Sequence, residues 1–344
     1  MPQDLIITPA AQQMILPNEL PALPGPVWQK KYLPPIILRS APDTAKHFIH
    51  FFTATIRNKN TRAAYGRAVG QFLAWLAQNG FDGELTDIEP DAVAGYIEVM
   101  VEMHSAPTAK QHLAAIRKLF DWLVVKGVLK INPATSVKGP SHSQTRGSTP
   151  FLTAKQTRQL LNAIDTDIIT GLRDRALIGI MAYAFSRISA ALALDVKDIF
   201  TIDRTLWLRL HEKGGKQHEM PCHHELAAYL DDYLEVSGLR AYPDNPLFPT
   251  ATRHRQPRLQ LGSDNRLRRR DALAMVKRRA LKAGLDPKIC NHSFRATGIT
   301  NFLQNGGEIE AARKMAAHSS IKTTHVYDRR GDAVVIADVE RIRF

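Results

Sequence analysis

A breaker-rich segment near the middle of the chain limits what the chain can fold into. Residues 138–150 read Lys-Gly-Pro-Ser-His-Ser-Gln-Thr-Arg-Gly-Ser-Thr-Pro, and this density of proline, glycine and short polar residues sustains neither a helix nor an interior strand. The 344 residues are long for one hydrophobic core and comfortable for two. We therefore expect two domains joined by a linker over residues 134–152, which follows the helix-ending pair Asn132-Pro133.

Apolar residues at helical spacing predict a small all-helical first domain over residues 44–133. Tyr65, Val69 and Phe72 fall on one face of a long helix. A second helix opens at Pro90, because proline is tolerated in the first helical turn. A further apolar repeat of the same period completes a helical bundle.

Both ends of the chain differ in character from the predicted domains. Residues 1–43 carry nine prolines and no sustained helical period, so we expect an arm that becomes ordered on a partner. Residues 331–344 form an apolar tail on a charged background. This tail has to be covered, either by its own domain or by another subunit.

The second domain, residues 153–330, is predicted to be mostly helical with one small β element. Leu206, Leu208 and Leu210 alternate with Trp207 and Arg209, and this period is typical of a strand. The segment 213–216 separates this run from residues 218–221, so the two runs are expected to form a β-hairpin. Helices are expected over residues 153–164, 172–185, 225–236 and 271–283, and again up to residue 327.

The charge of the chain favours a polyanionic partner. Lys and Arg number 46 against 33 Asp and Glu, which gives a net charge of +13 and a pI near 9.8. Such an excess most often serves salt-sensitive binding to nucleic acid. No apolar run of about 18 residues predicts a membrane helix, and the two cysteines are read as reduced thiols. We expect a cytoplasmic protein.

Several basic residues are candidates for contacts with the phosphates of a DNA backbone, which would fix register without reading bases. Four lie on the predicted helices of the first domain. The others lie in the predicted hairpin turn and in the arginine-rich segment that precedes residue 271. The candidates are Arg62, Arg67, Lys110, Arg117, Lys216, Arg253, Arg255 and Arg258.

A set of polar side chains in the second domain suits chemistry on a phosphodiester. The charge of a phosphodiester grows toward its transition state, so fixed cations at its oxygens accelerate reaction. Arg187 and Arg295 suit this task, because a guanidinium group is always charged and offers paired donors. A free tyrosine has a pKa of about 10, so Tyr327 needs cations and a proton acceptor to become a nucleophile. His292 is the candidate base or relay, and His318 a candidate donor to the phosphate.

The order and spacing of these residues resemble those of the tyrosine recombinase, or phage integrase, family. In that family an arginine is followed by a lysine on a β-hairpin turn, an H-x-x-R box, a second histidine, and a tyrosine about nine residues later. The resemblance covers about residues 44–330. The matching motifs are Phe185-Ser186-Arg187-Ile188-Ser189, Glu212-Lys213-Gly214-Gly215-Lys216, His292-Ser293-Phe294-Arg295, Ala317-His318-Ser319-Ser320 and Thr324-His325-Val326-Tyr327-Asp328.

The resemblance implies a mainly α fold. A SAM-like helical core-binding domain would precede a mostly helical catalytic domain with a small β-hairpin or sheet, the DNA breaking-rejoining enzyme fold. It also implies a site-specific recombinase, similar to the Xer and Cre enzymes, that acts on double-stranded DNA as a homo-oligomer. A tetramer on two sites would be the active form, the tail would pack on a neighbouring subunit, and accessory proteins could assist.

Covalent catalysis follows from the same resemblance. Tyr327 would form a 3′-phosphotyrosyl linkage, and Lys213 would protonate the 5′ oxygen that leaves. Lys216, in the same turn, is the alternative acid or a phosphate clamp. The family usually has an acidic residue where this chain has Ala190, and often a glycine where it has Ala317, a small change that should be tolerated.

No cofactor or metal is expected. The chain has no GxxxxGK[ST] loop for ATP. A group of histidines and one cysteine near the hairpin lacks a second ligand pair at standard zinc spacing. This group comprises His211, His218, Cys222, His223 and His224.

Two other functions remain as alternatives. A type IB topoisomerase-like enzyme would use similar chemistry to relax supercoils, without needing an inverted-repeat site. A DNA-binding regulator could keep the fold and lose catalysis, although all six polar positions are present here.

Overall fold

The computed structural model describes residues 33–142, 147–211, 217–254, 256–328, 339–340 and 342. The chain divides into two compact units between residues 143 and 144, within the expected linker. Each unit has a hydrophobic core of its own. Lys213, Lys216, Arg255, residues 1–32 of the expected arm and most of the tail lie outside the described residues.

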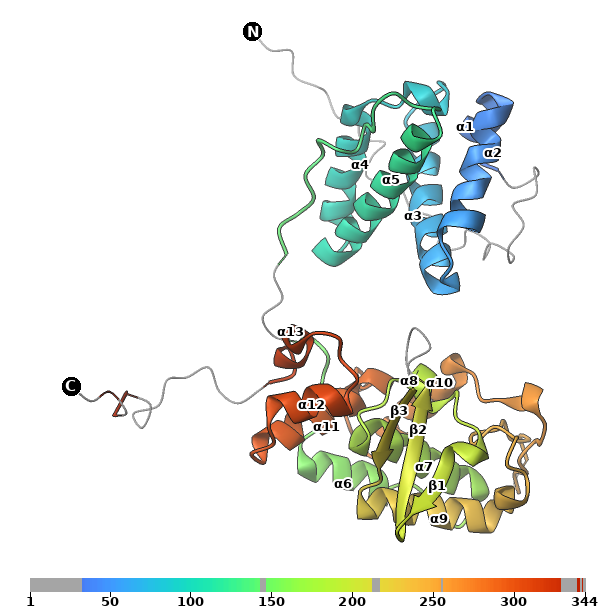
Figure 1. Ribbon diagram of the computed structural model, residues 1–344, viewed down its shortest axis with the longest axis vertical. Helices are drawn as coiled ribbons and strands as arrows, with labels where there is room; N and C mark the ends of the chain where they lie inside the picture. The colour runs from blue at the N-terminus through green and yellow to red at the C-terminus, as the bar shows by residue number, and fades with distance from the viewer. Residues whose placement is uncertain are drawn as a thin grey trace. The chain divides into compact units, whose positions relative to one another are not determined.

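Unit 1 is a helical bundle (Figure 1). Proline occupies the first turn of four of its helices, where the missing N–H group breaks no hydrogen bond. The side chain of Asn58 caps the third helix by accepting the backbone N–H groups of Asn60 and Thr61. The helices are α1 (Pro35–Arg39), α2 (Pro42–His50), α3 (Lys59–Gln78), α4 (Pro90–Met103) and α5 (Ala106–Val125), and Phe51–Thr55 form a π-helical turn after α2.

The expected arm is too long at its C-terminal end. Leu33, Ile36 and Ile37 are buried in the core of unit 1, so the described residues from Leu33 onward belong to this unit. The sequence misled us because Pro35 and Pro42 indicated disorder, whereas each begins a short helix.

The described ends of the expected linker also pack on the two units. Ala134 and Val137 are buried in the core of unit 1, and Leu152 is buried in the core of unit 2. The side chain of Arg117 donates to the carbonyl oxygens of both Ala134 and Val137. The expected linker therefore includes segments that belong to the domains on either side.

Unit 2 contains the only sheet among the described residues, and it is antiparallel in the order β1-β2-β3. Leu208 on β2 pairs with Ile199 on one side and with Met220 on the other. The expected hairpin is confirmed as β2 and β3, whereas β1 was not predicted. The strands are β1 (Ile199–Ile202), β2 (Thr205–His211) and β3 (Gln217–Pro221).

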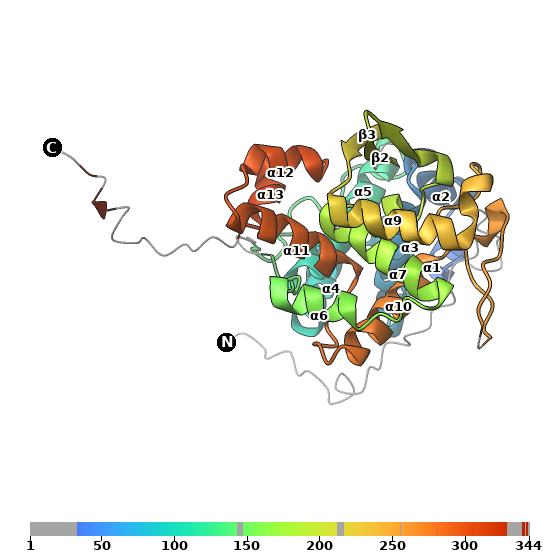
Figure 2. The same cartoon turned by 90° about the horizontal axis from the view of Figure 1, so that it is seen from below.

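Helices form the rest of unit 2, so the mainly α fold with a small sheet is confirmed. The helix α7 (Ile169–Tyr183) is buried on most sides, and α9 (His224–Ser237) and α11 (Asn291–Gln304) pack against it (Figure 2). Gly298 on α11 lies where a Cβ atom would be 1.9 Å from the carbonyl oxygen of Ala182. The remaining helices are α6 (Ala154–Asn162), α8 (Ile188–Ala191), α10 (Arg269–Lys282), α12 (Ile309–Met315) and α13 (Ile321–His325).

Candidate active site

Five of the six expected catalytic residues meet in unit 2. Arg187 is the N-cap residue of α8, while His292 and Arg295 lie on the first turns of α11. His318 follows α12, and Tyr327 follows α13. Contacts or electrostatic effects link all five. The sixth, Lys213, lies between β2 and β3, outside the described residues.

Tyr327 lies between His292 and His318. Its hydroxyl oxygen is 2.7 Å from Nε2 of His292. Its ring stacks on that of His318, with a centroid distance of 5.7 Å and an interplanar angle of 15°. The backbone carbonyl of Tyr327 accepts a hydrogen bond of 3.0 Å from the hydroxyl of Thr300 on α11. Only 9% of the residue is exposed, so the phenol is held rather than mobile on the surface.

Arg295 is at the centre of the site and is 1% exposed. Its Nη1 donates to the carbonyl oxygen of Phe185, and its Nη2 lies 2.6 Å from both the carbonyl oxygen of Ala316 and Nε2 of His318. The guanidinium group thus joins the segment before Arg187 to the segment that carries His318. Such charge-assisted hydrogen bonds are stronger than neutral ones.

The two segments that Arg295 joins both contain a residue with left-handed backbone. Phe185 has a φ of 49° and Ala317 a φ of 47°. For residues other than glycine this conformation costs roughly 1–2 kcal/mol. Alanine at position 317 therefore costs more stability than its similarity in size to glycine suggests, because its Cβ atom strains the backbone beside His318.

Both histidines are held in the neutral form at neutral pH. Burial, followed by the charges of Arg295 and Arg187, lowers the pKa of His318 to about 3. The same causes lower the pKa of His292, although part of His292 reaches the surface. A neutral His292 can accept the proton of the Tyr327 hydroxyl, which agrees with its expected role as base or relay.

Ala190 is buried on α8 and is 3% exposed. Because the residue is alanine, this position supplies no carboxylate beside Arg187. An acidic side chain at the same position would be buried. The arginine motif of this chain thus lacks the charge that the family usually places there.

Sequence reasoning missed three residues that support the site. Thr324 on α13 places its Oγ1 atom 2.9 Å from Nδ1 of His318, and Thr300 holds the backbone of Tyr327. Arg313 on α12 donates to the carbonyl oxygen of His318 at 2.9 Å. Thr300 lies outside the quoted motifs, and Thr324 begins the tyrosine motif without a predicted role of its own, so only the fold reveals what these two residues contact.

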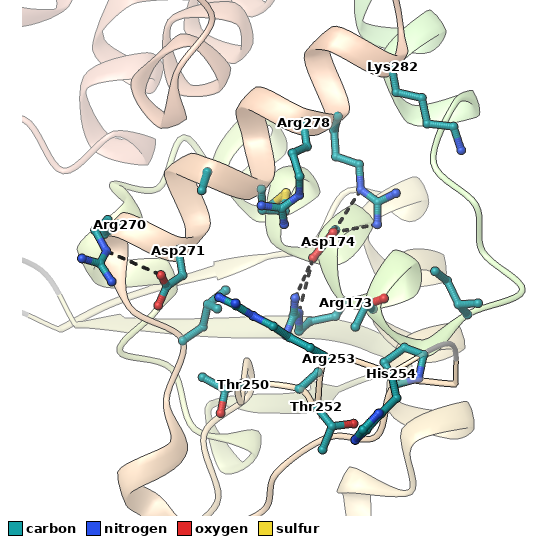
Figure 3. A pocket seen from close by; sticks show the side chains of 18 residues that line it. Arg173, Asp174, Thr250, Thr252, Arg253, His254, Arg270, Asp271, Arg278 and Lys282 are labelled. Carbon is teal, nitrogen blue, oxygen red and sulfur yellow. Dashed lines mark hydrogen bonds and ion pairs between the residues drawn. The ribbon is translucent and has the colours of Figure 1, made fainter.

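A basic cavity of about 790 Å³ lies elsewhere in unit 2, between α10, the start of α7 and the loop after Thr250 (Figure 3). Six arginines and lysines line it against two aspartates. Asp174 is neutralised by Arg173 and Arg279, both within about 3.1 Å. The cations lining the cavity are Arg173, Arg253, Arg270, Arg278, Arg279 and Lys282.

The expected DNA-contacting residues fall into different environments. Arg67, Lys110, Arg253 and Arg258 are exposed, and Arg253 reaches into the basic cavity (Figure 3). Arg62 instead donates twice to the carbonyl oxygen of Ile56. Arg117 binds backbone carbonyls in the same way, so both side chains have structural partners, and their contact with DNA stays a prediction.

Two of the histidines considered for zinc have other partners. His211 lies 3.2 Å from the carboxylate of Asp198, while His223 caps α9 and stacks on Tyr183. Over the described ranges, no three His, Cys, Asp or Glu side chains gather in a way that could hold a metal ion. In the same ranges, no helix combines the length and apolar character needed to cross a membrane.

Known proteins resemble the chain in both units. The profile of the phage integrase N-terminal SAM-like domain matches residues 46–127. Tyrosine recombinase XerD of Corynebacterium glutamicum is 29% identical over 277 residues, covering 78% of this chain and 86% of XerD. Tyrosine recombinase XerC of Salmonella typhi is 27% identical over 215 residues, covering 62% of this chain and 66% of XerC.

Solved structures share the fold. The XerH site-specific recombinase in a post-cleavage complex with its palindromic difH substrate has a TM-score of 0.61 at 19% identity, covering 79% of this chain and 76% of that one. A lambda integrase dimer bound to a COC′ core site has a TM-score of 0.62 at 14% identity, covering 85% and 97%. The profile of the phage integrase family matches residues 150–333, more than half of the chain and all five clustered side chains. The chain belongs to the phage integrase family.

Proposed function

We propose that this protein is a site-specific DNA recombinase that cuts and rejoins strands through a 3′-phosphotyrosyl intermediate. The observation that carries the proposal is the Tyr327 hydroxyl 2.7 Å from the neutral His292, with His318 stacked on the same ring and Arg295 bonded to His318. A nucleophile, a base and fixed cations thus stand together in one chain.

The proposed reaction combines these positions with the roles that the family resemblance implies for Lys213 and Lys216. The Tyr327 oxygen attacks the phosphorus atom and passes its proton to Nε2 of His292. Arg187 and Arg295 stabilise the charge that grows on the phosphate oxygens. The bond to the 5′ oxygen breaks, and Lys213 supplies the proton for the new 5′-hydroxyl group, with Lys216 as the alternative. A second 5′-hydroxyl then attacks the phosphotyrosine, which frees Tyr327 and rejoins the DNA without ATP.

The finer parts of the proposal concern partners. The substrate is double-stranded DNA, bound as a homo-oligomer that becomes a tetramer when two sites meet. The tail packs on a neighbouring subunit, and accessory proteins adjust direction. The relatives support oligomers on DNA, since lambda integrase is known as a dimer on a core site and as a tetramer on a Holliday junction. A DNA substrate and two free thiols favour the cytoplasm.

The test uses full-length protein and a duplex selected from a random library by binding to it. A nick beside the cleavage position lets the short fragment leave, which traps the covalent adduct for a denaturing gel. The wild type should form the adduct, and Tyr327→Phe should form none. Tyr242→Phe, which alters an exposed tyrosine, serves as the matched control. An adduct with Tyr327→Phe would refute the assignment of the nucleophile.

The same experiment separates the alternatives. Cleavage at one position of an inverted repeat, together with exchange between two such sites on a plasmid, is expected of a recombinase. Relaxation of supercoils without a preferred site would indicate the topoisomerase-like function. A shifted band in a native gel with no adduct at all would indicate a regulator without catalysis.

A further inference from the structure

An acidic groove of about 670 Å³ runs along one side of unit 1. It lies between α4 and residues 136–140, which follow α5 along the chain and pass beside α4 (Figure 1). Three carboxylates and one ammonium group are among the described residues that line it, although the whole chain has a net charge of +13. The carboxylates are those of Asp91, Glu98 and Glu102, and the ammonium group is that of Lys138.

Apolar side chains complete the lining of the acidic groove. Ile97 and Val137 belong to the core of unit 1 and are buried, while Val101 is 44% exposed. Glu98 and Glu102 lie four residues apart on α4, so they are neighbours on the same face of the helix. These carboxylates repel the phosphates of DNA. A partner that fits the groove must therefore combine apolar side chains with positive charge.

The end of α5, residues 125–131, has both of these properties. Val125 and Ile131 are 76% and 78% exposed, more than any other large apolar residue in the part of the chain that the structure describes. Lys126 and Lys130 are exposed within the same seven residues. The ammonium group of Lys126 lies 4.6 Å from the centre of the Trp122 ring, which restricts the directions in which it can point.

The groove and the α5 end complement each other but cannot be the same contact surface. No residue of 125–131 lines the groove, so one copy of the chain can use both surfaces at once. A contact between the groove of one copy and the α5 end of the next is heterologous, and such contacts close into a ring when the rotation between copies allows it. A tetramer on two DNA sites would contain four of them.

We propose that the acidic groove binds the α5 end of a neighbouring copy, with Ile131 covered by the groove and with Lys126 and Lys130 paired with its carboxylates. This contact rests on the proposed function, because the copies meet on DNA. Burial of exposed apolar surface supplies attraction between the copies. The opposite charges determine which faces meet, since like charges placed together in an interface are costly.

The test reverses these charges and measures, by sedimentation velocity, how much full-length protein is needed to join two selected duplexes. The groove variant Glu98→Lys, Glu102→Lys should need roughly tenfold more protein than the wild type, because like charges then face each other. The α5-end variant Lys126→Glu, Lys130→Glu should show the same loss. The variant with all four substitutions should assemble within about threefold of the wild type, since opposite charges meet again.

Two further variants serve as control and as independent evidence. Asp82→Lys, Glu235→Lys adds the same charge as the groove variant at two exposed residues outside the groove, and it should assemble like the wild type. Ile131→Ser changes no charge and should still weaken assembly several-fold, because roughly the apolar area of one side chain would no longer be covered. Binding of single copies to half of the duplex shows that each variant is folded.

Each outcome decides on the contact. A groove variant that assembles like the wild type would overturn it. So would failure of the fourfold variant to assemble, since the groove would then hold another partner, such as the tail. If the α5-end variant lowered the slope of log K against log salt by about 2 for a single copy, its lysines would contact phosphates instead.

The fate of the proposed function is read separately. A wild type that never joined two duplexes would overturn the contact, yet a covalent adduct on the nicked duplex would leave the phosphotyrosyl chemistry standing. Assembly that depends on these charges, with no adduct, would support the contact and refute the chemistry.

Discussion

At the scale of single residues, strain is concentrated where the arginine binds. Phe185 and Ala317 both adopt left-handed backbone, and Arg295 binds the carbonyl oxygens of Phe185 and Ala316. Such strain persists only where the surroundings hold it in place. A buried guanidinium group that binds both segments provides that restraint, so the residue proposed to act on the phosphate also shapes its own site.

Ala317→Gly should stabilise the protein. Glycine adopts a φ of 47° without a clash, so relief of the backbone strain should raise the free energy of unfolding by about 1 kcal/mol. The greater conformational entropy of glycine in the unfolded chain offsets part of this gain. The measurement is urea denaturation. Ala311→Gly, in the right-handed backbone of α12, is the matched control and should lower stability by about 0.5–1 kcal/mol. Equal destabilisation by both substitutions would contradict the strain at Ala317.

The sequence predicted the polar side chains that cluster in unit 2 better than it predicted the residues that support them. Arg187, His292, Arg295, His318 and Tyr327 could be found because their chemistry and spacing are specific. Thr300 and Thr324 could not, since a buried threonine carries no signal until its partner is known. The roles of individual arginines were also hard to predict, because the sequence does not show whether a side chain such as that of Arg62 binds a phosphate or a backbone carbonyl oxygen.

At the scale of elements, long periodic helices were predictable and short elements were not. The prediction of α7, α9 and α10 succeeded because each carries three or more turns of apolar period. The strand β1 was missed because Asp203 and Arg204 form its turn to β2 with positive φ, although neither is glycine or asparagine. The helix α1 was missed because five residues are too few to show a period.

The packing of α11 on α7 depends on one missing side chain. In Gly298→Ala, the new Cβ atom would lie 1.9 Å from the carbonyl oxygen of Ala182 and 2.7 Å from the ring of Phe185. The helices must separate, so we expect the free energy of unfolding to fall by about 2–3 kcal/mol. Adduct formation should slow as well, because the Phe185 carbonyl that Arg295 binds would shift.

Gly70→Ala is the matched control for this effect. Gly70 lies inside α3 with nothing within 4 Å of a new Cβ atom, so this substitution should raise stability by about 0.5–1 kcal/mol. Urea denaturation measures both variants. If Gly298→Ala were as stable as the wild type, α11 would not depend on close contact with α7.

At the scale of the whole molecule, positive charge is the property that links the proposed function to both units. The excess of 13 charges predicts strong, salt-dependent binding to a polyanion. Exposed cations occur in unit 1, as at Arg67 and Lys110, while unit 2 has its basic cavity. DNA that contacts both units would release counterions from both, so each contact should contribute separately to the salt dependence.

Arg253 and Arg278, which line the basic cavity from the loop and from α10 (Figure 3), offer the sharpest test of this additivity. For the full-length protein, the double variant Arg253→Gln, Arg278→Gln should reduce the slope of log K against log salt by about 2, since each lost phosphate contact removes about 0.9. Fluorescence anisotropy with a labelled duplex measures the slope. Arg175→Gln is the control with no expected change, because Arg175 pairs with Asp232 and stacks on Tyr229. An unchanged slope in the double variant would place the DNA backbone away from this cavity.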